Sequence, residues 1–159
     1  MSAWHKLVRH QDHEETRQSD LSIRKSNIHG RGCFTNADIT AGQLVAEFTG
    51  ELISSEESAR RRLGQRKYSL CAVDDNHVID GSVGGNPTQY INHCCEPNCE
   101  VIIRYGRVMI YAIRDIRSND ELTVDYQSSY HSNRKLCRCG AKHCRGTINQ
   151  QKGRTTSPR

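Results

Sequence analysis

Three cysteines near the carboxyl end of the chain have the spacing of a metal site. Residues 137–144 read CRCGAKHC, which places Cys137, Cys139 and Cys144 within one short loop. Three thiolates this close suit tetrahedral Zn²⁺, which takes four ligands in a structural site. The alternative of a redox pair is weak, because C-x-C differs from the C-x-x-C of thioredoxin-like proteins. The residues alone leave the fourth ligand open, with four candidates: Cys94, Cys95, Cys99 and His143.

A second cysteine-rich stretch, NHCCEPNC at residues 92–99, holds three of the eight cysteines. Clustered cysteines in a reducing compartment favour metal binding or catalysis over disulfides. Taken with residues 137–144, they indicate one of two classes. The first is a zinc module that binds nucleic acid, and the second is an enzyme closed by a zinc-bound segment.

The net charge of +5 is concentrated at one end of the chain. Residues 127–159 carry eight Lys and Arg and no acidic residue, so the rest of the chain is slightly acidic. A basic end can contact nucleic acid or an acidic partner, or it can be a solvated tail. The 159 residues contain no apolar run long enough to span a membrane and no signal peptide after Met1. We therefore expect an intracellular protein of one domain that does not enter a membrane.

The elements that must position these residues are mostly short strands. Apolar runs broken by turn residues predict strands within 21–26, 29–34, 43–53, 68–73, 77–81, 100–113 and 121–126. The run at 100–113 is expected to be a hairpin that turns at Tyr105-Gly106. Ser54, with Glu57 three residues later, predicts the start of one exposed basic helix that continues through residues 57–67 and is weakened by Gly64. The pattern is that of a mostly β domain.

Five motifs, in order along the chain, resemble those of the SET-domain protein lysine methyltransferases. The match runs from about Leu21 to Thr147, and N-H-x-C-x-P-N followed by E-L-T-x-D-Y and C-x-C-x4-C is highly specific. The matching stretches are HGRG at 29–32, FTGE at 48–51, QYINHCCEPN at 89–98, DELTVDY at 120–126 and CRCGAKHCRG at 137–146.

The resemblance implies a SET-domain fold of small curved β-sheets, with a C-terminal pseudoknot, one short inserted helix and a zinc-binding post-SET segment. Its expected divisions are an N-terminal tail at 1–20, the SET domain at 21–126, the post-SET segment at 127–147 and a basic C-terminal tail at 148–159. The resemblance also assigns the fourth ligand to Cys95. The remaining cysteines are then interpreted as small buried hydrophobes: Cys33, Cys71, Cys94 and Cys99.

The implied activity is methyl transfer from S-adenosylmethionine to a lysine side-chain amine, with one structural zinc. Tyr126 is the expected catalytic residue, although a tyrosine ending a strand is more often half-buried packing. Gly30 and Gly32 are expected to let the backbone approach the cofactor. The resemblance places eight residues at the cofactor: His29, Gly30, Arg31, Gly32, Tyr68, Asn92, His93 and Arg138.

The chain departs from the family pattern at three positions that bear on activity. Phe48 stands where a tyrosine is usual, Gln89 where arginine is usual, and Val124 where many members have a larger aromatic residue. The smaller Val124 and the missing hydroxyl at Phe48 favour transfer of more than one methyl group. The departures also leave open a weakly active enzyme.

The expected substrate is a histone or another basic protein, with a further nucleic-acid contact through the basic C-terminal residues. The compartment would be the nucleus in a eukaryote and the cytoplasm in a prokaryote. Two alternatives remain: a basic zinc module that binds nucleic acid or chromatin without catalysis, and a reader that binds lysine without modifying it.

Overall fold

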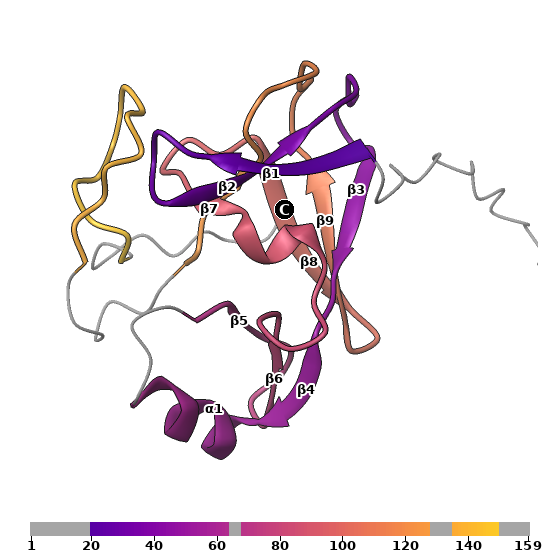
Figure 1. Cartoon of the computed structure of the whole chain (residues 1–159), viewed down its shortest axis with the longest axis vertical. Coiled ribbons are helices and arrows are strands. Elements are labelled where there is room, and N and C mark those ends of the chain that lie inside the picture. The colour runs from indigo at the N-terminus through magenta and orange to yellow at the C-terminus, as the bar shows by residue number, and fades with distance from the viewer. Residues whose placement is uncertain (1–19, 64–67, 128–134, 150–159) are drawn as a thin grey trace, which may run out of the picture.

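A computed structural model describes residues 20–63, 68–127 and 135–149, and within them the chain is mostly β, as the sequence predicts (Figure 1). Two antiparallel sheets have three strands each, in the orders β3-β9-β8 and β4-β6-β5. Two further sheets have two strands each, β1-β2 antiparallel and β7-β10 parallel. The strands are β1 (Leu21–Lys25), β2 (Arg31–Thr35), β3 (Leu44–Phe48), β4 (Glu51–Ser54), β5 (Leu70–Ala72), β6 (His77–Asp80), β7 (Asn92–His93), β8 (Cys99–Arg104), β9 (Arg107–Ala112) and β10 (Thr123–Val124).

The helix α1 (Ser55–Arg62) begins where the capping motif predicts. The Ser54 side chain accepts a hydrogen bond from the Glu57 N–H at 3.1 Å, which satisfies one free amide of the first turn. The helix ends at Arg62, and the expected continuation through residues 64–67 lies outside the described residues. None of the described helices is long and apolar enough to cross a membrane.

Polar contacts, rather than an apolar face, hold α1 against its sheet. Only Ser58 of the helix is buried. Arg61 donates to Glu51 of β4 and to Asp80 of β6, each at 2.8 Å, and to Glu57 at 2.9 Å. The Arg61 guanidinium therefore holds the helix against the sheet, and the other basic residues of the helix face solvent.

Two glycines explain where neighbouring strands break or turn. The predicted strand 43–53 divides into β3 and β4 at Gly50, where an added Cβ would lie 2.2 Å from the Asp80 carbonyl oxygen. The β8–β9 hairpin turns at Tyr105 and Gly106 as predicted, with φ of 51° and 73°. Positive φ at both central residues is the requirement of a type I′ turn, whose twist matches that of the strands.

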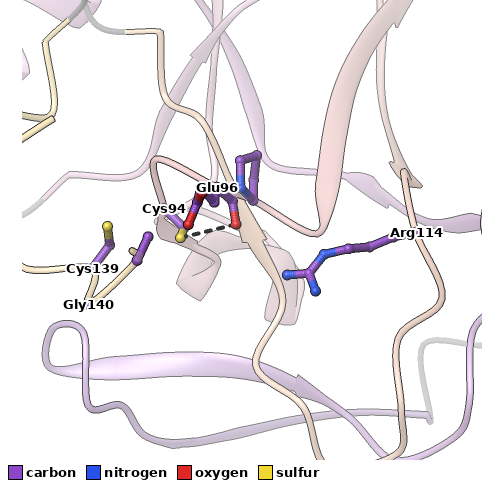
Figure 2. Close-up of a pocket in the computed structure, with 7 residues that line it drawn as sticks. Cys94, Glu96, Arg114, Cys139 and Gly140 are labelled. Carbon is purple, nitrogen blue, oxygen red and sulfur yellow. Dashed lines mark hydrogen bonds between the residues drawn. The ribbon is translucent and has the colours of Figure 1, made fainter. Parts of the chain in front are cut away.

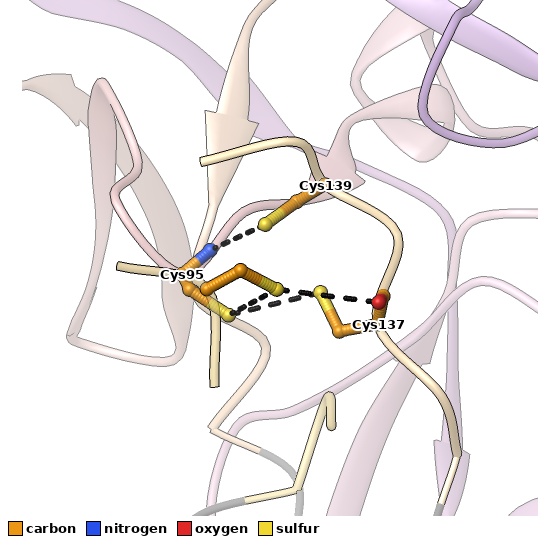
Figure 3. Close-up of side chains that lie close together, drawn as sticks. Cys95, Cys137 and Cys139 are labelled. Atoms are coloured by element: carbon orange, nitrogen blue, oxygen red, sulfur yellow. Dashed lines mark hydrogen bonds between the residues drawn. The ribbon is translucent and has the colours of Figure 1, made fainter. Parts of the chain in front are cut away.

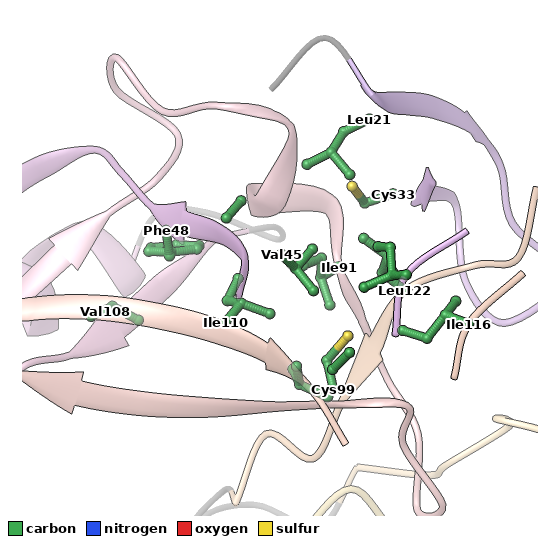
Figure 4. Close-up of a cluster of buried hydrophobic side chains, with 14 of the residues drawn as sticks. Leu21, Cys33, Val45, Phe48, Ile91, Cys99, Val108, Ile110, Ile116 and Leu122 are labelled. Atoms are coloured by element: carbon green, nitrogen blue, oxygen red, sulfur yellow. The ribbon is translucent and has the colours of Figure 1, made fainter. Parts of the chain in front are cut away.

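One apolar cluster joins the sheets (Figure 4). Its most buried members include Val45, Val108 and Leu122, which come from β3, β9 and the segment before β10. The cysteines interpreted as packing residues behave accordingly: Cys33 and Cys99 are fully buried, Cys94 is buried, and Cys71 is half-buried against the cluster. Burial raises the pKa of the Cys33 and Cys99 thiols to about 12, so both remain protonated in the core.

The short parallel ladder between β7 and β10 matters most for the site. It pairs Asn92 with Thr123 and His93 with Val124, and the Cys94 N–H continues it by donating to the Val124 carbonyl at 3.0 Å. Two segments separated by about thirty positions in the sequence therefore lie side by side. The 3₁₀ helix η2 (Pro87–Tyr90) precedes β7 and packs against β1, β2 and β3.

Candidate functional site

Tyr126 emerges from the end of β10 directly beside β7. Its ring lies 5.4 Å from the His93 ring, and its N–H donates to His93 Nδ1 at 3.2 Å. Its hydroxyl donates to the Ile91 carbonyl at 2.7 Å. The residue is 47% exposed, although its hydroxyl contacts the backbone of buried Ile91.

The environment of the Tyr126 hydroxyl keeps it protonated. Burial, followed by the negative charge of Glu121, raises its pKa to about 12. A hydroxyl that stays protonated at neutral pH can donate a hydrogen bond and orient an amine. It cannot act as the base that removes a proton from an ammonium group.

The Asn92 side chain holds the loop that contains the predicted cofactor residues. Its amide nitrogen donates to the carbonyls of His29 and Arg31 at 3.2 and 3.1 Å. The same nitrogen lies 2.8 Å from Glu121 Oε1. Asn92, predicted as a cofactor residue, therefore lies in this cluster, and its side chain holds the backbone of residues 29–31.

Glu121 is a residue of this cluster that sequence reasoning did not single out. Its carboxylate accepts a hydrogen bond from the Ser26 hydroxyl, which lies 2.7 and 2.8 Å from the two oxygens, and another from Asn92. Ser26 in turn accepts from the amides of Ile28 and His29. The available signal was its place in ELTVDY, five residues before Tyr126.

Gly32 has a packing role that the sequence did not indicate. A Cβ at this position would lie 2.3 Å from Glu121 Oε1 and 3.1 Å from Ser26 Cβ. The missing side chain therefore makes room for a carboxylate of the protein itself. Gly30, at φ 54°, has the left-handed backbone that glycine adopts readily, and its carbonyl accepts from the Ser26 N–H at 2.9 Å.

Substituting alanine for Gly32 is expected to destabilise the fold by about 1–3 kcal/mol, because the new methyl group must displace the Glu121 carboxylate. Chemical denaturation of the purified variant measures this loss. The double variant Gly32→Ala/Glu121→Ala supplies the control, since removing the carboxylate reopens the space. Its loss should be smaller than the sum of the two single losses, and strict additivity would contradict this account.

The His93 side chain links Tyr126 to the cysteines. Because Nδ1 accepts from the Tyr126 amide, the ring proton is assigned to Nε2, which lies 3.4 Å from Cys95 Sγ. Burial lowers the pKa of His93, opposed by the nearby Asp125 carboxylate, and the ring is 3% exposed. A neutral imidazole therefore connects the backbone of Tyr126 with a candidate metal ligand.

The four predicted ligand cysteines come together in space (Figure 3). Their sulfur atoms all lie within 4.8 Å of one another. Cys95 Sγ is 3.7 Å from Cys137 Sγ and 3.9 Å from Cys144 Sγ. A tetrahedral Zn²⁺ with Zn–S bonds of about 2.3 Å requires sulfurs about 3.8 Å apart. The donor set and its spacing therefore fit one zinc ion, with Cys139 as the fourth member.

Backbone amides around the cluster suit thiolate ligands. The Cys95 N–H donates to Cys139 Sγ at 3.5 Å, and the Arg145 N–H donates to Cys95 Sγ at 3.4 Å. His143, an open candidate from sequence, instead pairs its Nδ1 with Glu96 Oε1 at 2.5 Å at the exposed surface. It lies outside the four-sulfur set.

A bidentate ion pair ties the segment of residues 135–149, here called the cysteine segment, to β10. Arg145 Nη1 and Nη2 donate to the two carboxylate oxygens of Asp125 at 2.6 and 3.0 Å. Nη2 also donates to the Ile148 carbonyl. Burial acts to raise the pKa of Asp125, but the Arg145 hydrogen bonds and charge outweigh it, so the pKa lies below its usual range.

This pair is expected to make stability depend on pH in the acid range. A carboxyl whose folded pKa is depressed stabilises the fold above its unfolded pKa of about 3.9 and loses that contribution as pH falls through the folded pKa. The difference in free energy of unfolding between wild type and Asp125→Asn should therefore be constant from about pH 5 to 7 and shrink below about pH 4. Urea denaturation of both proteins at each pH measures it. A difference that does not change with pH would contradict the assignment.

The other predicted cofactor residues lie at the surface. Arg31 stacks on the Tyr90 ring at 4.2 Å and donates to its hydroxyl at 2.5 Å. His29 is exposed beside it. The Tyr68 hydroxyl accepts a hydrogen bond from Lys135 Nζ at 2.7 Å, so it joins the residues just before β5 to the cysteine segment. Arg138 is exposed and has no ion pair among the described residues.

A hollow with an open volume of about 550 Å³ lies next to Cys139 (Figure 2). Of the predicted site residues it includes only Cys139, so it does not coincide with the expected cofactor contacts. Its lining residues are Cys94, Glu96, Pro97, Arg114, Cys139, Gly140 and Ala141.

Comparison with known proteins identifies this arrangement. The family model described as "SET domain" matches residues 30–127. Trithorax, a histone-lysine N-methyltransferase of Drosophila melanogaster, is 37% identical over 147 residues, covering 86% of this chain and 4% of that protein. Histone-lysine N-methyltransferase 2B of Homo sapiens is 38% identical over 146 residues, covering 86% of this chain and 5% of that protein.

A fungal relative agrees with these two. The "Histone-lysine N-methyltransferase, H3 lysine-4 specific" of Candida albicans is 36% identical over 145 residues, covering 84% of this chain and 14% of that protein. The chain thus spans less than a sixth of the length of each relative named here. The family match includes residues 30–32, β7, β10 and Tyr126, and the chain belongs to the SET domain family.

Proposed function

We propose that this chain is the catalytic domain of a protein-lysine methyltransferase that uses S-adenosylmethionine and modifies lysine 4 of histone H3. The observation that carries the proposal is the β7–β10 ladder, which sets the Tyr126 hydroxyl 2.7 Å from the Ile91 carbonyl, beside the NHCC motif. Three relatives of 36–38% identity are named histone-lysine methyltransferases, and one of those names specifies lysine 4 of histone H3.

The residues around Tyr126 suit a cationic cofactor. S-adenosylmethionine supplies a methyl group on a positively charged sulfur, which is a good leaving group. The hydroxyl of Tyr126 and the carbonyl of Ile91 present oxygen atoms side by side. The negative charge of the Glu121 carboxylate also contributes to raising the pKa of this hydroxyl. Electronegative atoms held in fixed positions favour a cation over a neutral molecule. Asn92 would keep the 29–31 backbone in place for cofactor contact.

The task left to the chain is to present a neutral lysine amine in line with the methyl group. An unperturbed lysine has a pKa of about 10.4, so the bound amine must lose a proton. Tyr126 cannot take that proton, since its own pKa is raised to about 12. Its role is to orient the amine, and alignment of this kind supplies up to about 7–11 kcal/mol of a barrier. Loss of water around the amine lowers its pKa.

One structural zinc, held by Cys95, Cys137, Cys139 and Cys144, would fix the cysteine segment beside the active site. The links from this segment to the active-site strand are His93, between Cys95 and Tyr126, and the Arg145–Asp125 pair.

Phe48 and Val124 bear on the number of methyl groups transferred, and both side chains are buried. Phe48 lacks the hydroxyl of a tyrosine, and Val124 is smaller than an aromatic residue, so both would leave room for a methylated amine. We therefore propose that the product carries more than one methyl group.

A histone substrate implies action on chromatin, so we propose a nuclear location. The basic side chains of the C-terminal residues would add a contact with nucleic acid, although only part of that region is among the described residues. Such a contact would be sensitive to salt, because it depends on release of counterions from phosphate.

Incubation with methyl-labelled S-adenosylmethionine and a histone H3 peptide tests the proposal. The matched control is the same peptide with arginine in place of lysine 4. Label should enter only the first peptide, and mass spectrometry should find products with two or more methyl groups. Cofactor binding without label in any histone would contradict the proposal that a histone is the substrate. Absence of both cofactor binding and label, with salt-dependent DNA binding, would favour a non-catalytic zinc module.

A further inference from the structure

Strand β8 forms one edge of the β3-β9-β8 sheet. The two-residue turn makes Arg104 and Arg107 the first hydrogen-bonded pair of the hairpin, so hydrogen-bonded and non-hydrogen-bonded pairs alternate from there. Val101 and Ile103 are in non-hydrogen-bonded pairs with β9, and their N–H and C=O groups therefore point away from it. No strand among the described residues pairs with this outer side.

Two apolar side chains of β8 lie on the face that continues the core and are nevertheless exposed. Val101 lies opposite Ile110, and Ile103 lies opposite Val108. Directly opposed residues share a face, and the two β9 residues are 2% and 1% exposed. In contrast, Val101 is 39% exposed and Ile103 is 46% exposed. An open edge with exposed apolar side chains is a template for pairing with another strand.

Two charges on the other face of β8 lack partners within the described chain. Glu100 and Arg104 are exposed and form no ion pair among the described residues. They lie on one face of the strand, about 13 Å apart along it, which is too far for them to pair with each other. Arg104 also lies opposite another cation, Arg107. Each charge would gain from an opposite charge brought by a neighbouring strand.

We propose that β8 pairs antiparallel with β8 of a second copy of this chain, with Ile102 on the two-fold axis. This register sets Val101 opposite Ile103 of the partner subunit, and Glu100 opposite Arg104 of the partner subunit. The outward N–H and C=O groups of Val101 and Ile103 then meet their counterparts, as an antiparallel ladder requires. The two three-stranded sheets become one continuous six-stranded sheet.

The sequence of β8 favours a second copy over an unrelated strand. When two copies of the stretch EVIIR are aligned antiparallel about Ile102, each acidic residue lies opposite a basic residue, and each apolar residue lies opposite another apolar residue. A two-fold axis through Val101 or Ile103 would set a charge opposite an apolar residue or leave it without a partner. An isologous contact of this kind closes after two subunits, so it yields a dimer rather than a fibre.

Sedimentation equilibrium over a concentration series tests the dimer in the whole chain. Wild type should show a reversible monomer–dimer equilibrium. Glu100→Arg and Arg104→Glu, each alone, should weaken dimerisation roughly tenfold, because two attractive cross-strand pairs become repulsive. An equimolar mixture of these two variants should form a heterodimer, and the double variant Glu100→Arg/Arg104→Glu should dimerise like wild type. Lys25→Glu, on β1, is the control for a general effect of net charge.

Circular dichroism of every variant establishes that the fold is intact, since these side chains are exposed. A wild-type protein that stays monomeric at its highest soluble concentration overturns the proposal. A dimer that responds no more to the two charge reversals than to Lys25→Glu also overturns it, because the pairing would then lie elsewhere.

Discussion

Replacement of Tyr126 by phenylalanine is expected to lower the turnover of methyl transfer by a factor of about 10²–10³, the usual cost of removing one oriented hydrogen-bond donor from an active site. The change removes only the hydroxyl and its bond to the Ile91 carbonyl. The ring still packs on His93, and the Tyr126 backbone N–H still donates to His93 Nδ1. Cofactor affinity should therefore stay near that of wild type, so that the loss appears in turnover.

The control for this prediction is Tyr111→Phe. Tyr111 lies on β9 opposite Glu100 and belongs to neither β7 nor β10, so loss of its hydroxyl should leave turnover unchanged. Label transfer to the histone peptide and calorimetric titration with S-adenosylmethionine, run on both variants, separate turnover from binding. Transfer at the wild-type rate in Tyr126→Phe would remove this residue from the mechanism.

Replacement of Cys139 by serine is expected to abolish zinc binding and to release the cysteine segment from the domain. A serine hydroxyl cannot replace a thiolate ligand, and structural zinc sites contribute apparent binding energies of about 10–16 kcal/mol to folding. Zinc content should fall from about one ion per chain to near zero. Amide hydrogen exchange should lose protection in residues 135–149 while β3, β8 and β9 stay protected.

Cys94→Ser is the matched control, because Cys94 is the neighbouring thiol outside the four-sulfur set. It should keep its zinc and the protection of the cysteine segment. A chelator added to wild type should reproduce the effect of Cys139→Ser. One zinc ion per chain retained in Cys139→Ser would show that the four sulfurs do not form the site.

Features that depend on adjacent residues could be predicted from the sequence. The Ser54 cap, the turn at Tyr105-Gly106 and the mostly β character follow from short-range rules, and the structure confirms them. The cysteine set needed more than spacing. Cys95 stands 42 positions before Cys137, so only the resemblance to a family could choose it over Cys94 or His143.

Side-chain direction at the site could not be predicted, because it depends on partners far away in the chain. Ser26 and Glu121 form a hydrogen bond across 95 positions, and nothing local to either residue indicates the other. The motif singled out Asn92 and His93 but did not reveal that the first holds a backbone loop and the second contacts Cys95. Likewise, the motif did not reveal that Gly32 packs against a carboxylate from another motif.

The two-residue ladder between β7 and β10 has a consequence for how the protein is made. The site is assembled from Ser26, the strands at 92–93 and 123–124, and Arg145. Almost the whole domain must therefore be synthesised before all the contacts of the site can form. Contacts of such large sequence separation are formed late and slowly, since loop closure must precede them. We therefore expect refolding in which the β8–β9 hairpin gains protection early and the ability to bind cofactor appears last, limited by the docking of residues 121–126.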